Sequence, residues 1–255
     1  MNSKELKDFL DYKVAMYEQP HFLEHDPIQI PHLFKKKEDI EIAGFLVSSI
    51  AWGNRITIIK SGKLMLELMG NDPYHFVRHH TKKDLAPFSN FVHRTFNGLD
   101  LSYFIKALKY LYSKHNGLEA AFSKTLTNNR LDKNIHEFRN TFFELKHEKR
   151  TEKHVADPIK GSAAKRINMF LRWMVRDSKK GVDFGIWKKI SPAQLSCPLD
   201  VHSGNVARNL GLLNRKQNDQ KAVEELDLCL RKFDPNDPVK YDYALFGLGV
   251  FEGLK

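Results

Sequence analysis

The spacing of apolar residues between positions 158 and 177 constrains the fold of this chain more than any other feature of its sequence. Apolar side chains recur there at intervals of three and four positions, at Ile167, Phe170, Leu171, Met174 and Val175. This spacing places them on one face of an α-helix, which turns once in about 3.6 residues. Lys165, Arg172 and Arg176 fall together on the opposite face. We predict a helix that packs on its apolar face and presents a cationic face.

Helical spacing recurs along the chain, and no segment shows the alternating pattern of a half-buried strand. Helices are predicted over residues 3–19, 39–51, 56–69, 72–80, 85–112 with a break at 97–98, 118–126, 131–145, 200–210 and 219–233. Ser3 is expected to cap the first helix, and the highly charged stretch 146–153 to be a solvated linker. The sequence therefore predicts an all-α fold, and its 255 residues are enough for one large domain or two closely packed lobes.

The charge balance favours a polyanionic partner. Lysine and arginine number 41 against 31 aspartates and glutamates, which gives a formal net charge of +10. No apolar run reaches the length of about 18 residues that suggests a membrane span, and residues 1–11 are too charged for a secretion signal. Cys197 and Cys229 stand far apart, as expected in a reducing compartment. We expect a cytoplasmic protein that does not bind membranes.

A second informative segment, CPLDVHSGNVARNLGLL, runs from Cys197 to Leu213. Asp200 stands at the position of a helix N-cap, where a carboxylate can accept hydrogen bonds from backbone amides. The polar side of the helix that follows carries Asn205, Arg208 and Asn209. Taken alone, Asp200 is explained by its capping role.

This segment resembles the PVDTHVxRVxxRLGL segment of the helix-hairpin-helix DNA glycosylases, the superfamily of endonuclease III and the adenine glycosylases. The matching residues are Pro198, Leu199, Asp200, Val201, His202, Val206, Arg208, Leu210, Gly211 and Leu212. The family's aspartate is its catalytic carboxylate, so the resemblance implies that role for Asp200. It also implies that His202 and Arg208 contact DNA.

A further resemblance links residues 159–165 to the LPGVGxKTA hairpin of the same superfamily. Ile159, Gly161 and Lys165 match its leucine, first glycine and lysine, whereas Lys160 and Ala163 replace its proline and second glycine. The resemblance implies that Lys165 is the Schiff-base nucleophile of the bifunctional members, although a lysine here could also contact only phosphate or solvent. The residues that it places against DNA in this region are Gly161, Ser162 and Arg166, and we expect Arg172 and Arg176 on the cationic face to join them.

Two outer segments extend the resemblance. VSSIAWGNRITIIKSGKLMLEL resembles the LLSAQATDxxV region, with Ala51 where several relatives insert a glutamine into the duplex. We therefore expect Trp52, Asn54 or Arg55 to act as the wedge. The closing segment matches a D-x-A-L-x-x-L-G pattern, which packs beneath the active-site helix, through Asp242, Ala244, Leu245, Leu248 and Gly249.

Together the matched segments imply a two-lobed helix-hairpin-helix glycosylase fold with a cleft between the lobes. We expect one lobe to comprise residues 1–44 and 197–255 and the other residues 45–196. Many relatives carry a four-cysteine iron-sulfur loop, which is excluded here because only Cys229 follows Asp200. His75 and His79 have the spacing of a metal-binding pair but lack the acidic residue of the HExxH motif. We expect no metal and no cofactor.

The resemblance implies a DNA repair glycosylase with AP-lyase activity, which flips a damaged base out of duplex DNA and excises it through Lys165 and Asp200. The alternative is a non-catalytic DNA- or RNA-binding protein on the same scaffold, and a third possibility is a helical protein-interaction scaffold. A separation of roughly 4–8 Å between Lys165 and Asp200 favours catalysis. The sequence names neither the lesion nor a protein partner.

Overall fold

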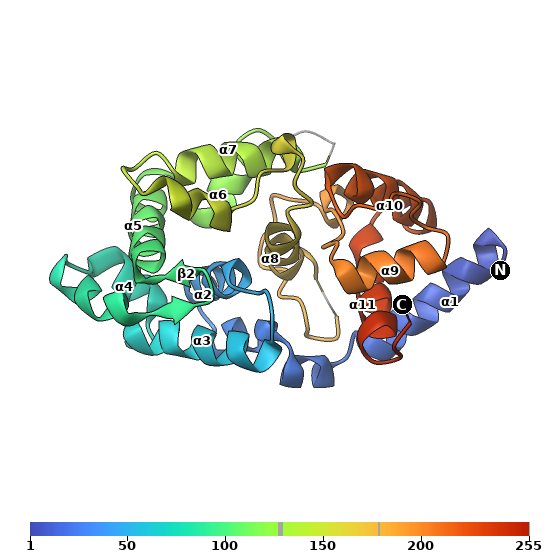
Figure 1. Ribbon diagram of the computed structural model, residues 1–255, viewed down its shortest axis with the longest axis horizontal. Coiled ribbons are helices and arrows are strands. Elements are labelled where there is room, and N and C mark those ends of the chain that lie inside the picture. The colour runs from blue at the N-terminus through green and yellow to red at the C-terminus, as the bar shows by residue number, and fades with distance from the viewer. Residues whose placement is uncertain (127–129, 178, 255) are drawn as a thin grey trace. The chain divides into compact units, whose positions relative to one another are not determined.

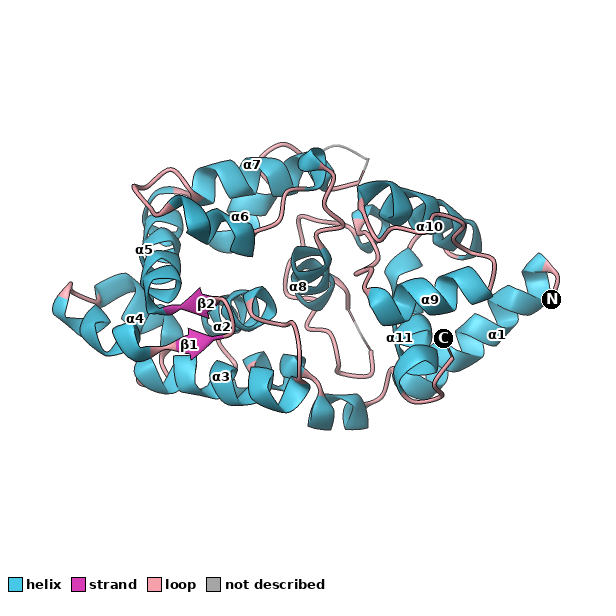
Figure 2. Cartoon of the chain, in the orientation of Figure 1, coloured by secondary structure: helices cyan, strands magenta, loops and turns pink. Residues whose placement is uncertain are grey.

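The computed structural model describes residues 1–126, 130–177 and 179–254. Most of these residues lie in helices and very few in strands, which confirms the all-α class (Figure 2). The chain divides into two compact units. The terminal unit comprises Met1–Phe22, Leu126–Lys133 and Asp157–Lys255, and the middle unit comprises Leu23–Thr125 and Asn134–Ala156.

These boundaries differ from those of the expected lobes. Residues 23–44 belong to the middle unit, and residues 157–196 belong to the terminal unit. The second difference has a clear physical cause, because two arginines in 157–196 form ion pairs with carboxylates of the terminal unit. Arg172 pairs with Asp242, and Arg176 pairs with Glu18 and Asp237.

The middle unit is built from short helices and one small hairpin. Its helices are α2 (Lys37–Ser49), α3 (Arg55–Leu68), α4 (Pro73–His79), α5 (Gly98–Lys114), α6 (Gly117–Phe122) and α7 (Asp132–Phe142) from Asn134 onward. Strands β1 (Val92–His93) and β2 (Phe96–Asn97) pair antiparallel. Phenylalanine rings form much of its core, with Phe45 packed against Phe104, Phe138 and Phe142.

The predicted helix over residues 85–112 is wrong in its first part. Lys83–Asn90 forms a 3₁₀ segment that contains Pro87, and the hairpin of β1 and β2 follows. Proline cannot continue an α-helix because it lacks a backbone N–H. Helix α5 begins only at Gly98, where an added Cβ would lie 2.2 Å from the Phe88 carbonyl oxygen. The chain therefore passes too close to itself here for any other residue.

Two smaller expectations are also wrong. Asn2, rather than Ser3, caps the first helix through hydrogen bonds from the backbone N–H groups of Lys4 and Glu5. The charged stretch 146–153 is not simply a solvated linker, because Lys149–His154 forms a 3₁₀ segment in which Thr151 is buried.

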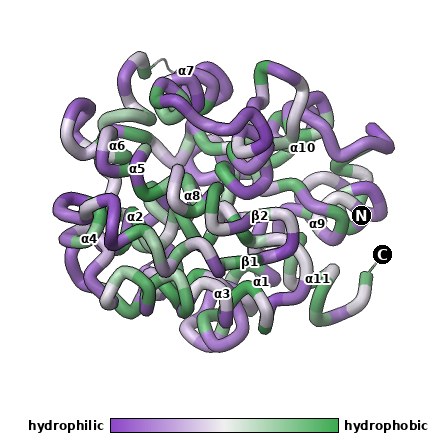
Figure 3. Tube along the Cα trace, turned by 60° about the vertical axis from the view of Figure 1, so that its left-hand side comes forward, coloured by the Kyte–Doolittle hydropathy of each residue, from purple (hydrophilic) through white to green (hydrophobic). Residues whose placement is uncertain are grey.

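The terminal unit contains α1 (Ser3–Tyr17), α8 (Lys165–Val175), α9 (Val201–Asn209), α10 (Gln220–Phe233) and α11 (Tyr241–Val250). Helix α11 packs along both α1 and α9 (Figure 1). Its approach to α1 is close, since a Cβ at Gly247 would meet the Tyr17 ring at 2.1 Å. Hydrophobic and hydrophilic residues alternate along the helices (Figure 3), as expected for elements that each bury one face.

Among the described residues, no helix is long and apolar enough to cross a membrane.

Candidate active site

The segment before α8 forms a tight turn around Gly161. Residues Pro158–Lys160 make a single 3₁₀ turn capped by Asp157. Gly161 follows in the left-handed region with φ of +90°, a conformation that glycine adopts without steric cost. Ala164 is also left-handed, with φ of +46°, which is costly for a residue that carries a Cβ. The turn ends at Lys165, the first residue of α8.

This turn is exposed on one side and anchored on the other. A Cβ built on Gly161 would meet no atom within 4 Å, so its outer side is open. Its carbonyl oxygen accepts a hydrogen bond from the Gln220 backbone N–H at 3.1 Å, which ties the turn to the start of α10. Ser162 Oγ accepts from the Ala164 N–H at 3.1 Å. Within the described chain, no side chain caps the first turn of α8.

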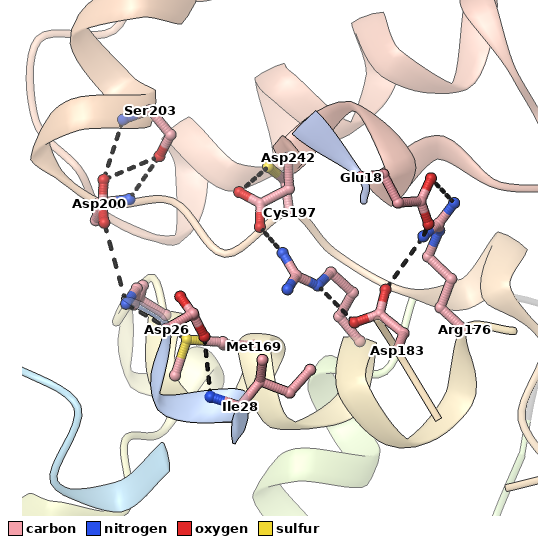
Figure 4. A network of polar contacts seen from close by, with 12 residues as sticks. Glu18, Asp26, Ile28, Met169, Arg176, Asp183, Cys197, Asp200, Ser203 and Asp242 are labelled. Carbon is pink, nitrogen blue, oxygen red and sulfur yellow. Dashed lines mark hydrogen bonds and ion pairs between the residues drawn. The ribbon is translucent and has the colours of Figure 1, made fainter. Parts of the chain in front are cut away.

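The start of α9 is capped by Asp200, as the sequence predicts. Its Oδ1 accepts a hydrogen bond from the Ser203 backbone N–H at 3.0 Å, and Ser203 Oγ accepts one from the Asp200 N–H at 2.9 Å (Figure 4). This reciprocal pair is a capping box, with serine in the place of the usual glutamate. Oδ1 is therefore committed to the helix.

The second oxygen of Asp200 faces Lys165. Lys165 Nζ lies 4.0 Å from Asp200 Oδ2, and the same nitrogen lies 3.6 Å from Met169 Sδ one turn along α8. Both side chains are partly accessible, with exposed fractions of 28% for Lys165 and 26% for Asp200. The separation falls at the short end of the range expected for a shared site. The two residues predicted to be catalytic are thus brought together.

The prediction that Arg172 and Arg176 form an exposed cationic face with Lys165 is wrong. Both arginines are buried. Arg172 donates to Asp242 and, at 3.3 Å, to Asp183 Oδ1. Arg176 donates to Glu18 and, at 3.1 Å, to Asp183 Oδ2 (Figure 4). It also donates to Asp237 at 2.9 Å. The guanidinium groups neutralise carboxylates inside the terminal unit and are not available to DNA phosphates.

The segment that follows α8 explains this burial. It packs back on the helix through hydrogen bonds from the Phe184 N–H to the Trp173 carbonyl and from the Trp187 N–H to the Met174 carbonyl. The Trp187 ring lies edge-on to Phe170, with centroids 5.3 Å apart. This segment carries Asp183, whose buried carboxylate pairs with both arginines. The periodicity of α8 alone does not reveal that this segment covers the helix.

Two buried aspartates hold the segment that leads to Asp200. The Cys197 backbone N–H donates to Asp227 Oδ1 at 2.9 Å, and Cys197 Sγ donates to Asp242 Oδ1 at 3.8 Å. Burial raises the pKa of the Asp227 carboxyl above its ordinary range. Burial likewise raises the pKa of Asp242, to about 6, although Arg172 opposes the shift. No sequence pattern pointed to Asp227, and the sequence predicted only a packing role for Asp242.

The other residues of the terminal unit that were predicted to contact DNA differ in exposure and in hydrogen-bond partners. His202 is exposed on the first turn of α9. Arg166 is half-buried, and burial lowers its pKa to about 10. Arg208 donates to the carbonyl oxygens of Arg215 at 2.8 Å and Lys216 at 2.9 Å, so it organises the loop after α9. A free DNA-contacting role for Arg208 would require it to release that loop.

The three candidate wedge residues belong to the middle unit. Asn54 caps α3, accepting a hydrogen bond from the Thr57 N–H at 3.2 Å. The half-buried Trp52 ring contacts His93 edge-on at 5.3 Å and stacks on His154 at 6.0 Å. Arg55, also half-buried, begins α3. Trp52 is therefore supported from beneath by buried imidazole rings.

In the part of the chain that the structure describes, no group of three or more histidine, cysteine or acidic side chains is arranged to hold a metal ion. The His75 and His79 rings do approach each other, with centroids 4.5 Å apart, but they stand as a pair.

The fold and the site define a predominantly helical protein of two units, in which a lysine and a capping aspartate meet where two helices begin. Residues 26–251 match the family described as Protein of unknown function (DUF2400), and the chain belongs to that family. Comparison with curated proteins and with solved structures gave no match.

Proposed function

We propose that this protein is a DNA repair glycosylase with AP-lyase activity on the two-lobed helix-hairpin-helix glycosylase fold. The observation that carries the proposal is the 4.0 Å separation of Lys165 Nζ and Asp200 Oδ2 beside the turn at Gly161. An amine and a carboxylate at this distance can exchange a proton after a small adjustment or through one water molecule. The resemblance of four sequence segments to that superfamily, in the superfamily's order, supports the same assignment.

In the proposed reaction, the neutral amine of Lys165 attacks C1′ of the damaged nucleotide. The bond from C1′ to the base breaks, and the base leaves with the electron pair and takes up a proton. Asp200 stabilises the positive charge that develops on the sugar and accepts the proton that the lysine loses. Asp200 can do this while its Oδ1 caps α9, because its Oδ2 faces the amine.

The strand is then cut by β-elimination. The C1′–O4′ bond opens, O4′ takes the electron pair and a proton, and the Lys165 nitrogen forms a Schiff base with C1′. Loss of a proton from C2′ then breaks the C3′–O bond, and the 3′ phosphate leaves with the electron pair. Water then hydrolyses the Schiff base and releases the amine. Each step uses only side chains and water, so the proposal includes no cofactor.

The proposed DNA contacts combine backbone and side-chain groups. The open turn at Gly161 and Ser162 leads into the uncapped first turn of α8, where backbone amides favour a phosphate. His202 adds a polar side chain at the start of α9. Trp52 is the wedge that we favour, because its ring is supported by two others and is partly accessible. Arg172 and Arg176 are buried and are left out of the proposed contacts.

The alternative, a non-catalytic nucleic-acid-binding protein, is favoured by one observation. Asp200 and Ser203 make a complete capping box, so the position of Asp200 is explained without any reaction. Under this alternative, the contact with Lys165 is an ordinary ion pair at the surface.

Base release from a panel of duplexes, each with one lesion, separates the two functions. The wild-type protein should release at least one damaged base, and Asp200→Asn should release it about 10²–10³-fold more slowly. Asparagine still caps helices well, so the variant should fold. If the wild-type protein binds every duplex and releases no base, the non-catalytic function replaces this proposal.

A further inference from the structure

Asp242 is a buried carboxylate behind the Lys165–Asp200 pair. It lies near the start of α11, which is otherwise largely apolar, and its side chain is only 9% exposed. Arg172 on α8 donates to Asp242 Oδ2, and Cys197 donates to Oδ1. A carboxylate is costly to bury and would be expected to be replaced by an apolar residue if it only filled space. Its partners connect it to both halves of the candidate active site.

The first connection runs through α8. Lys165 and Arg172 are seven positions apart, close to two helical turns, so their side chains point to the same face of the helix. Lys165 reaches Asp200 at the start of this face, and Arg172 reaches Asp242 farther along it. The two ion pairs therefore set the position of α8 against two different elements of the terminal unit.

The second connection runs through Cys197, three positions before Asp200. Its side chain is fully buried, with the thiol on Asp242 and the backbone N–H on Asp227. Figure 4 shows the thiol of Cys197 directed at Asp242, and the Asp200–Ser203 cap at the start of the helix that follows. Because Cys197 is held at two points, the position of the Asp200 carboxylate three residues later is restricted.

The two candidate catalytic residues also act electrostatically on Asp242. Besides burial and Arg172, Asp200 raises the pKa of Asp242 and Lys165 lowers it. The charged and titratable groups around Asp242 are Arg172 and Lys165 from α8, Cys197 and Asp200 from the segment before α9, and Asp183, which shares Arg172.

We propose that Asp242 is a positioning residue of this active site, which holds the Cys197–Asp200 segment in place. This inference rests on the proposed function for its meaning. Its physical content concerns the placement of the Cys197–Asp200 segment, and it can be measured without catalysis.

The main experiment compares Asp242→Asn with Asp183→Asn. Both variants replace a buried carboxylate that pairs with Arg172, but Asp183 bonds its Nε and Asp242 bonds its Nη1 and the Cys197 thiol. Amide hydrogen exchange in the 197–203 segment, which contains the Cys197 and Ser203 N–H groups, is measured by peptide mass spectrometry. Peptides from α5 in the middle unit serve as the internal standard.

In Asp242→Asn, the amides of the 197–203 segment should exchange at least about threefold faster than in wild type, because a neutral amide is a weaker acceptor for the Cys197 thiol and for Arg172, so the segment opens more often. Asp183→Asn should stay near the wild-type rate. Equal rates in all three proteins, or an equal rise in both variants, would overturn the inference.

A second variant tests the structural connection and covers a failure of Asp242→Asn to fold. Cys197→Ala removes only the thiol and leaves the carboxylate. With DNA that carries an abasic site, borohydride should trap the covalent adduct several-fold more slowly in this variant, and its 197–203 segment should exchange faster than in wild type. Trapping at the wild-type rate would show that Cys197 does not position Asp200. If the wild-type protein forms no adduct, the proposed function fails, and the amide exchange rates still decide the role of Asp242.

Discussion

At the scale of single residues, Asp200 combines two tasks because it has two oxygens. Oδ1 accepts from the Ser203 N–H and Oδ2 faces Lys165. Both residues were predicted although they are separated by 35 positions (200 − 165). The capping role of Asp200 follows from a local pattern, whereas its pairing with Lys165 was implied by the resemblance to the glycosylase superfamily. The buried Asp242 lies 42 positions beyond Asp200 (242 − 200), and no local pattern predicts its contact with Cys197.

Asp242 should give the stability of the protein a characteristic dependence on pH. Burial raises its pKa in the folded protein to about 6, from an ordinary value of 3.8, so folding favours the protonated form. Its stabilising contribution is therefore complete below about pH 4 and is lost as the pH rises through about 6. The asparagine of Asp242→Asn carries no charge at any of these pH values, so that variant lacks this pH dependence.

The difference in unfolding free energy, wild type minus Asp242→Asn, should fall between these two pH values and then level off. Urea titrations at a series of pH values measure it. A difference that rises with pH would contradict a raised pKa.

At the scale of elements, regular apolar spacing predicted the helices. It did not predict features that depend on contacts with segments distant in the sequence. Helix α10 was predicted to begin at Asp219, and the structure begins it at Gln220 with Asp219 as its cap. The strands of the hairpin, at Val92–His93 and Phe96–Asn97, have two residues each, too few to show alternation. The cationic face of α8 was buried by carboxylates from separate segments, which periodicity within one helix cannot reveal.

The packing of α8 predicts that its buried arginines support the fold. Arg172→Ala and Arg176→Ala should each lower the free energy of unfolding by about 3–5 kcal/mol, because each leaves buried carboxylates without their partner. Lys232→Ala, an exposed change on α10, should alter it by less than about 0.5 kcal/mol. Urea unfolding monitored by circular dichroism gives these values. Arginine variants as stable as Lys232→Ala would mean that these ion pairs contribute nothing.

At the scale of the whole molecule, the net charge of +10 predicts that the protein binds DNA electrostatically. We expect these contacts to be concentrated at the Gly161 turn. The logarithm of the association constant should fall linearly with the logarithm of salt concentration, by about 0.9 for each phosphate contacted. Lys160 is exposed beside Gly161, so Lys160→Gln should reduce this slope by close to one contact.

Lys232→Gln is the matched control. It removes an equal charge from the far end of α10, 12 residues along the helix from Gln220 and so about 18 Å from the anchored turn. Its slope should equal that of wild type in fluorescence anisotropy titrations. Equal reductions of the slope in both variants would mean that binding depends on net charge alone and not on the Gly161 turn.

The covalent adduct with Lys165 is the central claim, and borohydride trapping tests it most directly. Wild-type protein mixed with duplex DNA that carries an abasic site, and reduced with borohydride, should yield a stable protein–DNA adduct whose modified peptide contains Lys165. Lys165→Gln should yield none while keeping most of its affinity, because it loses one charge among many. Lys160→Gln, a variant of the other lysine of the turn, should still be trapped. An adduct that persists in Lys165→Gln, or wild-type protein that binds this DNA and is never trapped, would contradict the account.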